Sequence, residues 1–467
     1  MSWPFRKGAD HDLQGCLTGF RGSVWRVVRV HPVLTSTFRA YHGSKWEEDG
    51  VQGLSVWRRV LGIEGRTVLE RVDVDGDGTV VASVRPRRDA PMRCGRCGRE
   101  APGYDRGEGR RRWRALDVGT LRMVIEADAP RVDCIWCGPT VVAVPWARHN
   151  ARHTYEFDQT VAWLARFCAK RSVAWMFRIA WETVGSIIVR VMADVTVHME
   201  DRFANVRRIG IDEVSYGKGN KFLVVVFNHD NGQLLWVGTQ RLKATLGKFF
   251  DELGDERCQR IELVSADGAD WIADMVGIRC PNAKLCMDPY HVIVWVNKAL
   301  DRVRGRVIST ARRDGATDLV DLVKDSRWAL LKNPTRLSDK QQRKLADIAK
   351  INNQLYRAYL LKEQLRQVFA PGGADRVGQL DEWLAWAARS QIAEFVELAR
   401  KMRRYRDDIA HTLTHQLTNA AVEGLNSRIR HLINIARGFR SVDALKALMR
   451  LHLGPYQPTL PGRPAHT

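Results

Sequence analysis

Two short apolar segments, each containing a carboxylate near its end, constrain the possible fold most strongly. One is residues 209–214, which contains Asp212, and the other is residues 262–268, which contains Asp267. Their apolar cores favour buried strands. The periodicity around them predicts strands at residues 208–214, 222–227, 234–238, 261–266 and 283–287, and helices over residues 242–253 and from residue 270.

Three successive antiparallel strands followed by alternating helix and strand are typical of a ribonuclease H-like sheet. In such a sheet the ends of the first and fourth strands lie side by side, and Asp212 and Asp267 occupy those places. A third acid, Glu423, follows Asp267 by 156 residues and lies in a helical pattern with arginines after it. Three such oxygen ligands suit Mg²⁺, which in turn suits phosphodiester chemistry. The alternative is three ordinary surface or capping acids, since Asp267 before Gly268 is also a helix-capping pattern.

The charge balance favours an anionic partner. The 467 residues include 74 Lys and Arg against 53 Asp and Glu, a net charge of +21, which is typical of proteins that bind nucleic acid. Charge alone also fits a generally basic proteome or ribosome-like adhesion. No apolar run approaches the roughly 20 residues that a membrane helix needs, and the N-terminus lacks an apolar secretory segment. We therefore expect a cytoplasmic protein whose nine cysteines stay reduced.

Four of these cysteines form two C-x-x-C pairs. They are Cys94 with Cys97 and Cys134 with Cys137, separated by 36 residues. Four thiolates from two such turns suit a tetrahedral structural zinc site. Because the separation exceeds the roughly 15 to 20 residues of a compact ribbon, we expect a hairpin between the pairs. The alternative is two unrelated pairs of buried cysteines.

The segment around the first cysteine pair is strongly basic. From residue 85 to residue 114 there are 11 arginines and four acids, so we expect this module to contact the DNA backbone, with Arg111 and Arg112 among the contacts. A merely solvated basic face is the alternative. Upstream, residues 67–85 alternate in the manner of two strands around Asp75-Gly76-Asp77-Gly78. That turn resembles a calcium loop but lacks the downstream Glu, so a hairpin is expected.

From residue 155 to residue 195 the apolar period becomes helical. A short helix, a tight turn and a longer helix starting at Trp181 form the layout of a helix-turn-helix, in which the longer helix reads DNA. The expected contacts are Trp181, Thr183 and Arg178. Three-helix units without DNA contact are also common. After His291 the chain is helical and charged for over a hundred residues, which predicts a helical insertion.

The predicted fold class is multidomain α/β. A ribonuclease H-like mixed sheet is interrupted by a helical insertion and preceded by a small zinc-binding domain and a helix-turn-helix. The expected parts are a poorly ordered extension (1–53), a zinc-binding β-rich domain (54–150), a helix-turn-helix (151–203), the first part of the catalytic core (204–292), the insertion (293–410), the final core helix with Glu423 (411–455) and a flexible tail (456–467).

Several short motifs carry a family likeness over about residues 54–455. They are Gly210-Ile211-Asp212-Glu213, Ser265-Ala266-Asp267-Gly268-Ala269, Asp288-Pro289-Tyr290-His291-Val292, Leu330-Leu331-Lys332-Asn333-Pro334, Asn419 through Asn426, and Arg437-Gly438-Phe439-Arg440-Ser441. Together they resemble bacterial insertion-sequence transposases of the ISL-three family. Cys137 stands where relatives often use His, a change that zinc tolerates. The first 50 or so residues match no part of that pattern.

The resemblance implies an Asp-Asp-Glu polynucleotidyl transferase that binds terminal inverted repeats and target DNA. Asp212, Asp267 and Glu423 would hold two Mg²⁺ (or Mn²⁺) about 3.5 to 4 Å apart, and the four cysteines would hold structural zinc. Two DNA ends must meet, so a homodimer or a larger assembly on the bacterial nucleoid is expected. Asp288 and His291 are secondary site candidates, and His291 is also explained as a helix-start residue satisfied by Asp288.

Two other functions fit parts of the sequence. A catalytically silent DNA-binding regulator derived from a transposase would keep the zinc module and the helix-turn-helix, although the intact set of three acids argues against it. A stand-alone nuclease or junction resolvase would cut DNA without joining it, and would not need so elaborate a DNA reader. Glu213 neighbours Asp212, but we expect it to point to the opposite side of its strand.

Overall fold

The computed structural model describes residues 50–63, 65, 67–198, 201–373, 375–417, 420–436, 438–456, 458 and 460–463. The chain divides into two compact units, Met1–Ser55 and Val56–Thr467. The expected N-terminal extension therefore lies outside the described residues, except for its last residues, which begin helix α1 (Gly50–Val60).

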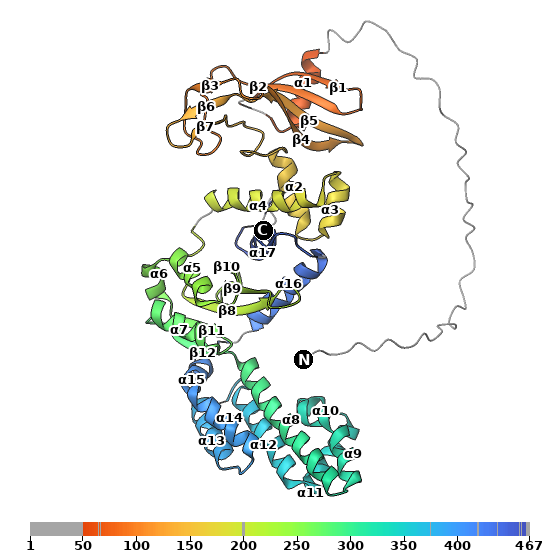
Figure 1. Cartoon of the computed structure of the whole chain (residues 1–467), viewed down its shortest axis with the longest axis vertical. Coiled ribbons are helices and arrows are strands. Elements are labelled where there is room, and N and C mark those ends of the chain that lie inside the picture. Colours follow the sequence, from red (N-terminus) through yellow and green to blue (C-terminus); the bar gives the residue numbers. More distant parts are fainter. Residues whose placement is uncertain are drawn as a thin grey trace, which may run out of the picture. The chain divides into compact units, whose positions relative to one another are not determined.

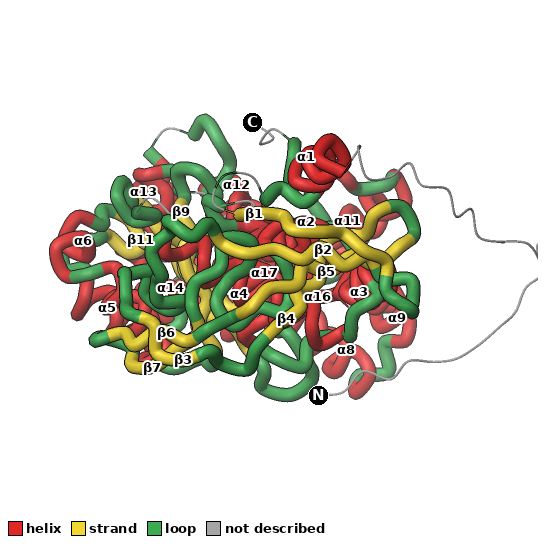
Figure 2. The backbone as a smooth tube through the Cα atoms, turned by 90° about the horizontal axis from the view of Figure 1, so that it is seen from above, coloured by secondary structure: helices red, strands yellow, loops and turns green. Residues whose placement is uncertain are grey.

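Two small sheets follow α1 in the second unit. One has the strand order β1-β2-β5-β4 and the other has the order β3-β6-β7 (Figure 2). The turn at residues 75–78 joins β1 to β2, and the carboxylates of Asp75 and Asp77 accept hydrogen bonds from the backbone N–H of Thr79, so the predicted hairpin is confirmed. The predicted hairpin between the cysteine pairs is confirmed as β4 and β5. The strands are β1 (Thr67–Val74), β2 (Val80–Pro86), β3 (Gly103–Asp105), β4 (Arg110–Val118), β5 (Leu121–Asp128), β6 (Arg131–Cys134) and β7 (Gly138–Val141).

The predicted helical segment forms three helices. Thr154 accepts a hydrogen bond from the N–H of Phe157 and so starts the first of them. The turn between the second and third helices uses Arg178 in the left-handed region, at φ 53°. This is the expected short helix, tight turn and long helix. The helices are α2 (Tyr155–Ala165), α3 (Lys170–Phe177) and α4 (Trp181–His198).

The predicted ribonuclease H-like sheet is present, with the order β10-β9-β8-β11-β12 (Figure 1). β10, β9 and β8 are antiparallel, whereas β8, β11 and β12 are parallel. The predicted fourth strand is shorter than expected because Ile261 caps the short helix α6, which the apolar pattern did not reveal. The elements are β8 (Arg208–Ser215), β9 (Phe222–Asn228), β10 (Leu234–Thr239), α5 (Lys243–Leu253), α6 (Asp255–Arg260), β11 (Leu263–Ala266), α7 (Asp270–Arg279) and β12 (Lys284–Met287).

Helices cover both faces of this sheet. On one face, Ile209 and Ile211 of β8 pack in a core with residues of α5 and α7 such as Phe249 and Ile272. On the other face, Val214 shares a core with α16 (Ala420–Ala436), α17 (Val442–Leu453) and the three helices α2 to α4. The helix-turn-helix and the end of the catalytic domain therefore share one hydrophobic core.

The predicted helical insertion has a core of its own. Among the described residues, this core contains 32 buried apolar side chains, starting at Met287 and ending at Leu413. The insertion returns to the sheet through α15, where the hydroxyl of Thr412 donates to the carbonyl of Met287 at 2.8 Å and a ring nitrogen of His411 lies 3.1 Å from the carbonyl of Leu285. The elements are α8 (Pro289–Arg313), α9 (Thr317–Asp325), α10 (Arg327–Leu331), a 3₁₀ turn (Pro334–Arg336), α11 (Asp339–Ile351), α12 (Asn353–Val368), α13 (Arg376–Ala388), α14 (Ala393–Arg404) and α15 (Arg406–His415).

Within the described ranges, no single helix combines the length and apolar character that crossing a bilayer requires. Helices α3 and α4 meet that test only when taken together, and they are bent by 100° at their junction.

A glycine in β8 is required by the ring opposite it. Gly210 pairs with Phe227, and a Cβ on Gly210 would lie 1.8 Å from Cζ of that ring. Gly210→Ala should therefore lower the free energy of unfolding by about 1–3 kcal/mol, the usual cost of overpacking a core. Gly305→Ala in α8 is the control, because a Cβ there meets no atom within 4 Å. Urea unfolding should show the control at least as stable as the wild type, and equal stabilities for both variants would contradict this packing.

A half-buried histidine should make the sheet sensitive to acid. Burial, followed by the charge of Arg208, lowers the pKa of His229 from 6.5 to about 4, and its Nε2 lies 2.7 Å from the hydroxyl of Ser265. Because this folded-state pKa lies below the unfolded value, its contribution is present above pH 6.5 and is lost as the pH falls toward 4, by up to about 3 kcal/mol. His452 has the same lowered pKa.

The test is the slope of unfolding free energy against pH. His229→Gln should flatten the slope between pH 6.5 and pH 4 by up to the equivalent of one bound proton. An unchanged slope in His229→Gln would show that this histidine does not carry the acid sensitivity.

Candidate catalytic and metal-binding sites

Parallel pairing of β8 with β11 brings two predicted carboxylates together. Leu263, Val264 and Ser265 pair with Arg208, Ile209 and Gly210. Continuing this register by two residues places Asp267, just beyond the end of β11, opposite Asp212. The charge of Asp267 contributes to raising the pKa of Asp212, which agrees with that placement.

Asp212 is held by two hydrogen bonds. The backbone N–H of Glu213 donates to its Oδ1 at 2.6 Å, and the side-chain amide of Asn426 donates to its Oδ2. Burial raises the pKa of Asp212, the two hydrogen bonds oppose this, and the charge of Asp267 adds to it. Two carboxylates in one partly buried site repel each other, and a bound cation would relieve that repulsion.

The third predicted acid lies on the helix that supplies Asn426. Glu423 is in α16, three residues before Asn426, and its side chain is outside the described residues. The Oδ1 atom of Asn426 is buried and has no hydrogen-bond partner among the described residues. Helix α16 therefore meets β8 at Asp212, and residues three apart on a helix share a face.

The secondary candidates form a pair beside these acids. Nδ1 of His291 lies 3.0 Å from Oδ2 of Asp288, whose other oxygen accepts the N–H of Tyr290 at the start of α8. The hydrogen bond to Asp288 raises the pKa of His291, with smaller contributions from the charges of Asp267 and Asp212. The predicted contact between His291 and Asp288 is thus present, and Asp288 also caps the start of α8. The imidazole lies in the field of the two acids as well.

Glu213 has a different environment from Asp212. Its side chain forms an ion pair with Arg241, while Oε1 is buried and has no partner among the described residues. Burial raises the pKa of Glu213. This carboxylate therefore has a guanidinium partner, whereas no ion pair of Asp212 is formed within the part of the chain that the structure describes.

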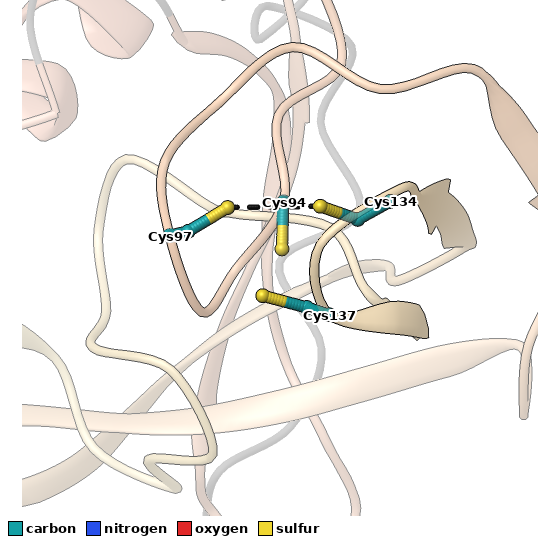
Figure 3. Close-up of side chains that lie close together, drawn as sticks. All are labelled: Cys94, Cys97, Cys134 and Cys137. Atoms are coloured by element: carbon teal, nitrogen blue, oxygen red, sulfur yellow. Dashed lines mark hydrogen bonds between the residues drawn. The ribbon is translucent and has the colours of Figure 1, made fainter.

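The four predicted cysteines converge in the N-terminal module. Figure 3 shows the sulfur atoms of Cys94, Cys97, Cys134 and Cys137 turned toward one another, and all four lie within 4.8 Å of each other. The Sγ atoms of Cys97 and Cys134 are 3.6 Å apart, close to the edge of about 3.8 Å expected for a tetrahedron with Zn–S bonds of about 2.3 Å. Within the described residues, this is the only such cluster of three or more His, Cys, Asp or Glu ligands.

The protonation of these thiols also suits a metal. Burial raises the pKa of Cys94. Hydrogen bonds from the backbone N–H groups of Cys97 and Arg96 and from the neighbouring thiols lower it, and together they bring the pKa to about 7. Burial and the neighbouring thiols raise the pKa of Cys137 to about 12. One thiol therefore loses its proton readily, and its negative charge makes deprotonation of the next thiol harder. A bound dication removes this repulsion between thiolates.

The residues expected to touch DNA mostly make contacts within the protein. Trp181 packs against the shared core with the ammonium group of Lys170 3.6 Å from its ring centre. Arg178 pairs with Asp117, and Thr183 is half-buried in the first turn of α4.

The two arginines of β4 that were expected to contact DNA also have partners within the protein. The guanidinium of Arg112 pairs with Glu126 and Asp75, and that of Arg111 lies 5.6 Å from the centre of the Trp113 ring. These ion pairs are partly exposed, so phosphate could replace the carboxylates at little cost.

Comparison with known proteins addresses the family directly. Three family models match the chain. The ISL3 catalytic-domain model, described as "Transposase", matches residues 209–449. The helix-turn-helix domain of transposase family ISL3 matches residues 142–192, and the zinc-finger of transposase IS204/IS1001/IS1096/IS1165 matches residues 90–137. The transposase for insertion sequence element IS1557 of Mycobacterium tuberculosis is 49% identical over 440 residues, covering 89% of this chain and 99% of the relative.

The chain belongs to the ISL3 family of transposases. A more distant relative, the transposase for insertion sequence element IS1001 of Bordetella parapertussis, is 27% identical over 339 residues, 71% of this chain and 82% of that protein. The family resemblance seen in the sequence is therefore confirmed, together with the order of zinc finger, helix-turn-helix and catalytic domain.

In this ISL3 transposase the zinc-finger match contains all four converging cysteines. Four sulfur ligands at tetrahedral spacing fit structural zinc. The paired carboxylates and the unpartnered Oδ1 of Asn426 fit a hard cation such as Mg²⁺.

Sequence reasoning missed Asn426 as an individual site residue. It falls at the end of the motif from Asn419 to Asn426 that carried part of the family likeness, three residues after Glu423. The helical spacing alone placed both residues on one face, but only the fold shows that this face meets Asp212.

Loss of one cysteine should empty the zinc site. Protein purified without chelator should contain one zinc ion per chain, and Cys134→Ser should contain almost none, because three remaining ligands cannot close a tetrahedral site. Cys168→Ser is the matched control, since its half-buried thiol lies outside the cluster. The measurement is the ratio of zinc to protein in each purified variant. A full complement of zinc in Cys134→Ser would show that Cys134 is not a zinc ligand.

Proposed function

We propose that this transposase cuts the ends of its insertion sequence and joins them to target DNA at one active site formed by Asp212, Asp267 and Glu423. The observation that carries the proposal is the meeting of three separate parts of the chain: β8 with Asp212, the end of β11 with Asp267, and the α16 turn that contains Glu423 and Asn426. Membership of a transposase family supports the same reaction class.

Divalent cations bound by these carboxylates would act as Lewis acids toward the oxygens of the phosphodiester. The chain's own part is to hold the ligands in place before DNA arrives. Asn426 fixes one oxygen of Asp212, and the backbone N–H of Glu213 fixes the other. Because Asp212 and Asp267 are already partly desolvated together, little rearrangement is needed to hold a cation.

The reaction proceeds in two steps, a hydrolysis and then a transesterification. First, water attacks a phosphorus atom at the end of the element, the bond to the 3′ oxygen breaks, and a 3′-hydroxyl and a 5′-phosphate result. Second, that 3′-hydroxyl attacks a phosphorus atom of target DNA and displaces a target 3′ oxygen. Each attacking oxygen loses one proton and each leaving oxygen gains one. His291, with a raised pKa beside the acids, is the side chain placed to hold such a proton.

The other modules bring the DNA to this site. The zinc ribbon and the helix-turn-helix, with Arg111, Arg112, Arg178, Trp181 and Thr183 as contacts, would bind the terminal inverted repeats. Binding would require the arginines to exchange their internal partners for phosphates. Two ends must be cut and joined together, so the active species is a homodimer or a larger assembly on DNA, acting in the bacterial cytoplasm at the nucleoid.

Replacing any acid of the proposed site should abolish cleavage without abolishing DNA binding. Asp212→Ala, Asp267→Ala and Glu423→Ala should each slow Mg²⁺-dependent cleavage on the order of 10³-fold or more, because loss of several kcal/mol of charge stabilisation costs a factor of ten per 1.36 kcal/mol. The substrate is a labelled duplex containing the DNA that borders the gene, and the product is a strand with a 3′-hydroxyl.

The matched control is Asp274→Ala, which removes an exposed acid of α7 that pairs with Lys243. It should cut normally. Normal cutting by one of the three site variants would remove that residue from the site. Failure of the wild type to cut with either Mg²⁺ or Mn²⁺, while still binding the duplex, would favour a silent DNA-binding regulator.

A further inference from the structure

Two adjoining hollows lie along helix α8 of the insertion, beside the proposed active site. One, of 310 Å³, is lined by α8 and α14, and the other, of 460 Å³, by α8 and α10. They share Lys298 and Arg302, so together they form one groove that follows α8.

Trp295 connects this groove to the aspartate turn of β11. A Cβ placed on Gly268 would lie 3.8 Å from Cη2 of Trp295, so the indole packs against the residue that follows Asp267. The same indole contacts the ring of Tyr405 at 5.5 Å, and the Tyr405 hydroxyl donates to Asp270 at 3.0 Å. The groove therefore begins at the edge of the proposed catalytic site.

The cations of the groove outnumber its acids. Four basic side chains, Lys298, Arg302, Arg327 and Lys401, line it together with two acids, Asp301 and Glu397. The pairs of Arg302 with Glu397 and of Arg327 with Asp301 are exposed or half-exposed, so they contribute little and can open for another anion.

Two of these cations have no acidic partner within ion-pair distance among the described residues. They are Lys298 and Lys401, and the ammonium of Lys401 instead sits 3.6 Å from the centre of the Trp295 ring. Burial lowers the pKa of Lys401, and the charges of Arg404 and Lys298 add to this, so the two lysines feel each other's charge. An anion between them would remove that repulsion.

We propose that this groove binds the sugar-phosphate backbone of the DNA strand next to the phosphodiester that is cut, with Lys298 and Lys401 on its phosphates and Trp295 as the wall between groove and active site. The inference rests on the proposed function, because the strand must reach Asp212 and Asp267. A phosphate backbone fits better than a protein partner, because Lys298 and Lys401 are compact ammonium groups on a concave track that reaches Trp295, next to the turn that follows Asp267.

The test measures how strongly salt weakens DNA binding. The full chain is titrated with a fluorescently labelled duplex of the DNA bordering the gene, with EDTA present so that no strand is cut. Lys298→Gln/Lys401→Gln removes two phosphate contacts, so the slope of log K against log salt should become less negative by about 1.8. With metal restored, this double variant should also cut the duplex with a raised KM.

Two companion variants make the result specific. Lys340→Gln/Lys350→Gln removes the same charge from exposed positions of α11 in the same insertion, and its slope should remain that of the wild type. Lys298→Arg/Lys401→Arg keeps the charge and should restore both slope and KM. If the glutamine variant keeps the wild-type slope and KM, the proposed DNA groove is wrong, even when cleavage is normal.

If the slope changes in the glutamine variant but the wild type does not cleave DNA, the groove proposal is retained and the proposed catalytic function is wrong.

Discussion

The parallel pairing of β8 with β11 is the interaction on which the site depends. The two strands are separated by an antiparallel hairpin pair and two helices, yet their register determines which carboxylates face each other. A slip of one residue would turn Asp212 toward the core of α5 and α7 and expose Ile211 to the other face. Placing two partly desolvated acids side by side costs free energy, and the packing of helices on both faces of the sheet offsets this cost.

The strands, the zinc ligands and the two aspartates could be predicted because their signals are local. Apolar runs mark buried strands, C-x-x-C spacing marks the metal turns, and known sheet topology places Asp212 beside Asp267. The meeting of α16 with Asp212 joins residues 214 positions apart, and no local pattern encodes it. The side chain of Glu423 lies outside the described residues, so its place in the site remains a prediction.

Charge partners were the least predictable feature. The sequence shows that Arg112 and Arg178 stand in basic surroundings, but not that Glu126 and Asp117 take up their guanidinium groups. One pair joins neighbouring strands and the other joins β4 to the turn after α3, so neither follows from closeness in the sequence. A count of arginines therefore predicts an affinity for DNA better than it predicts which arginines are free to meet it.

The insertion leaves and rejoins the sheet at one strand. α8 starts directly after β12, and α15 returns to the same strand through Thr412 and His411. An independent core can therefore be added there without stretching the sheet, as is usual where the two ends of an inserted unit lie close together.

The core that α4 shares with α17 has a consequence for dissecting the protein. Leu445, Leu448 and Leu451 of α17 pack in one core with Val184, Ile187 and Ile188 of α4. Helix α4 therefore takes part of its apolar support from the far side of the catalytic match. An excised helix-turn-helix would carry an uncovered apolar face, and exposed faces of that kind promote aggregation.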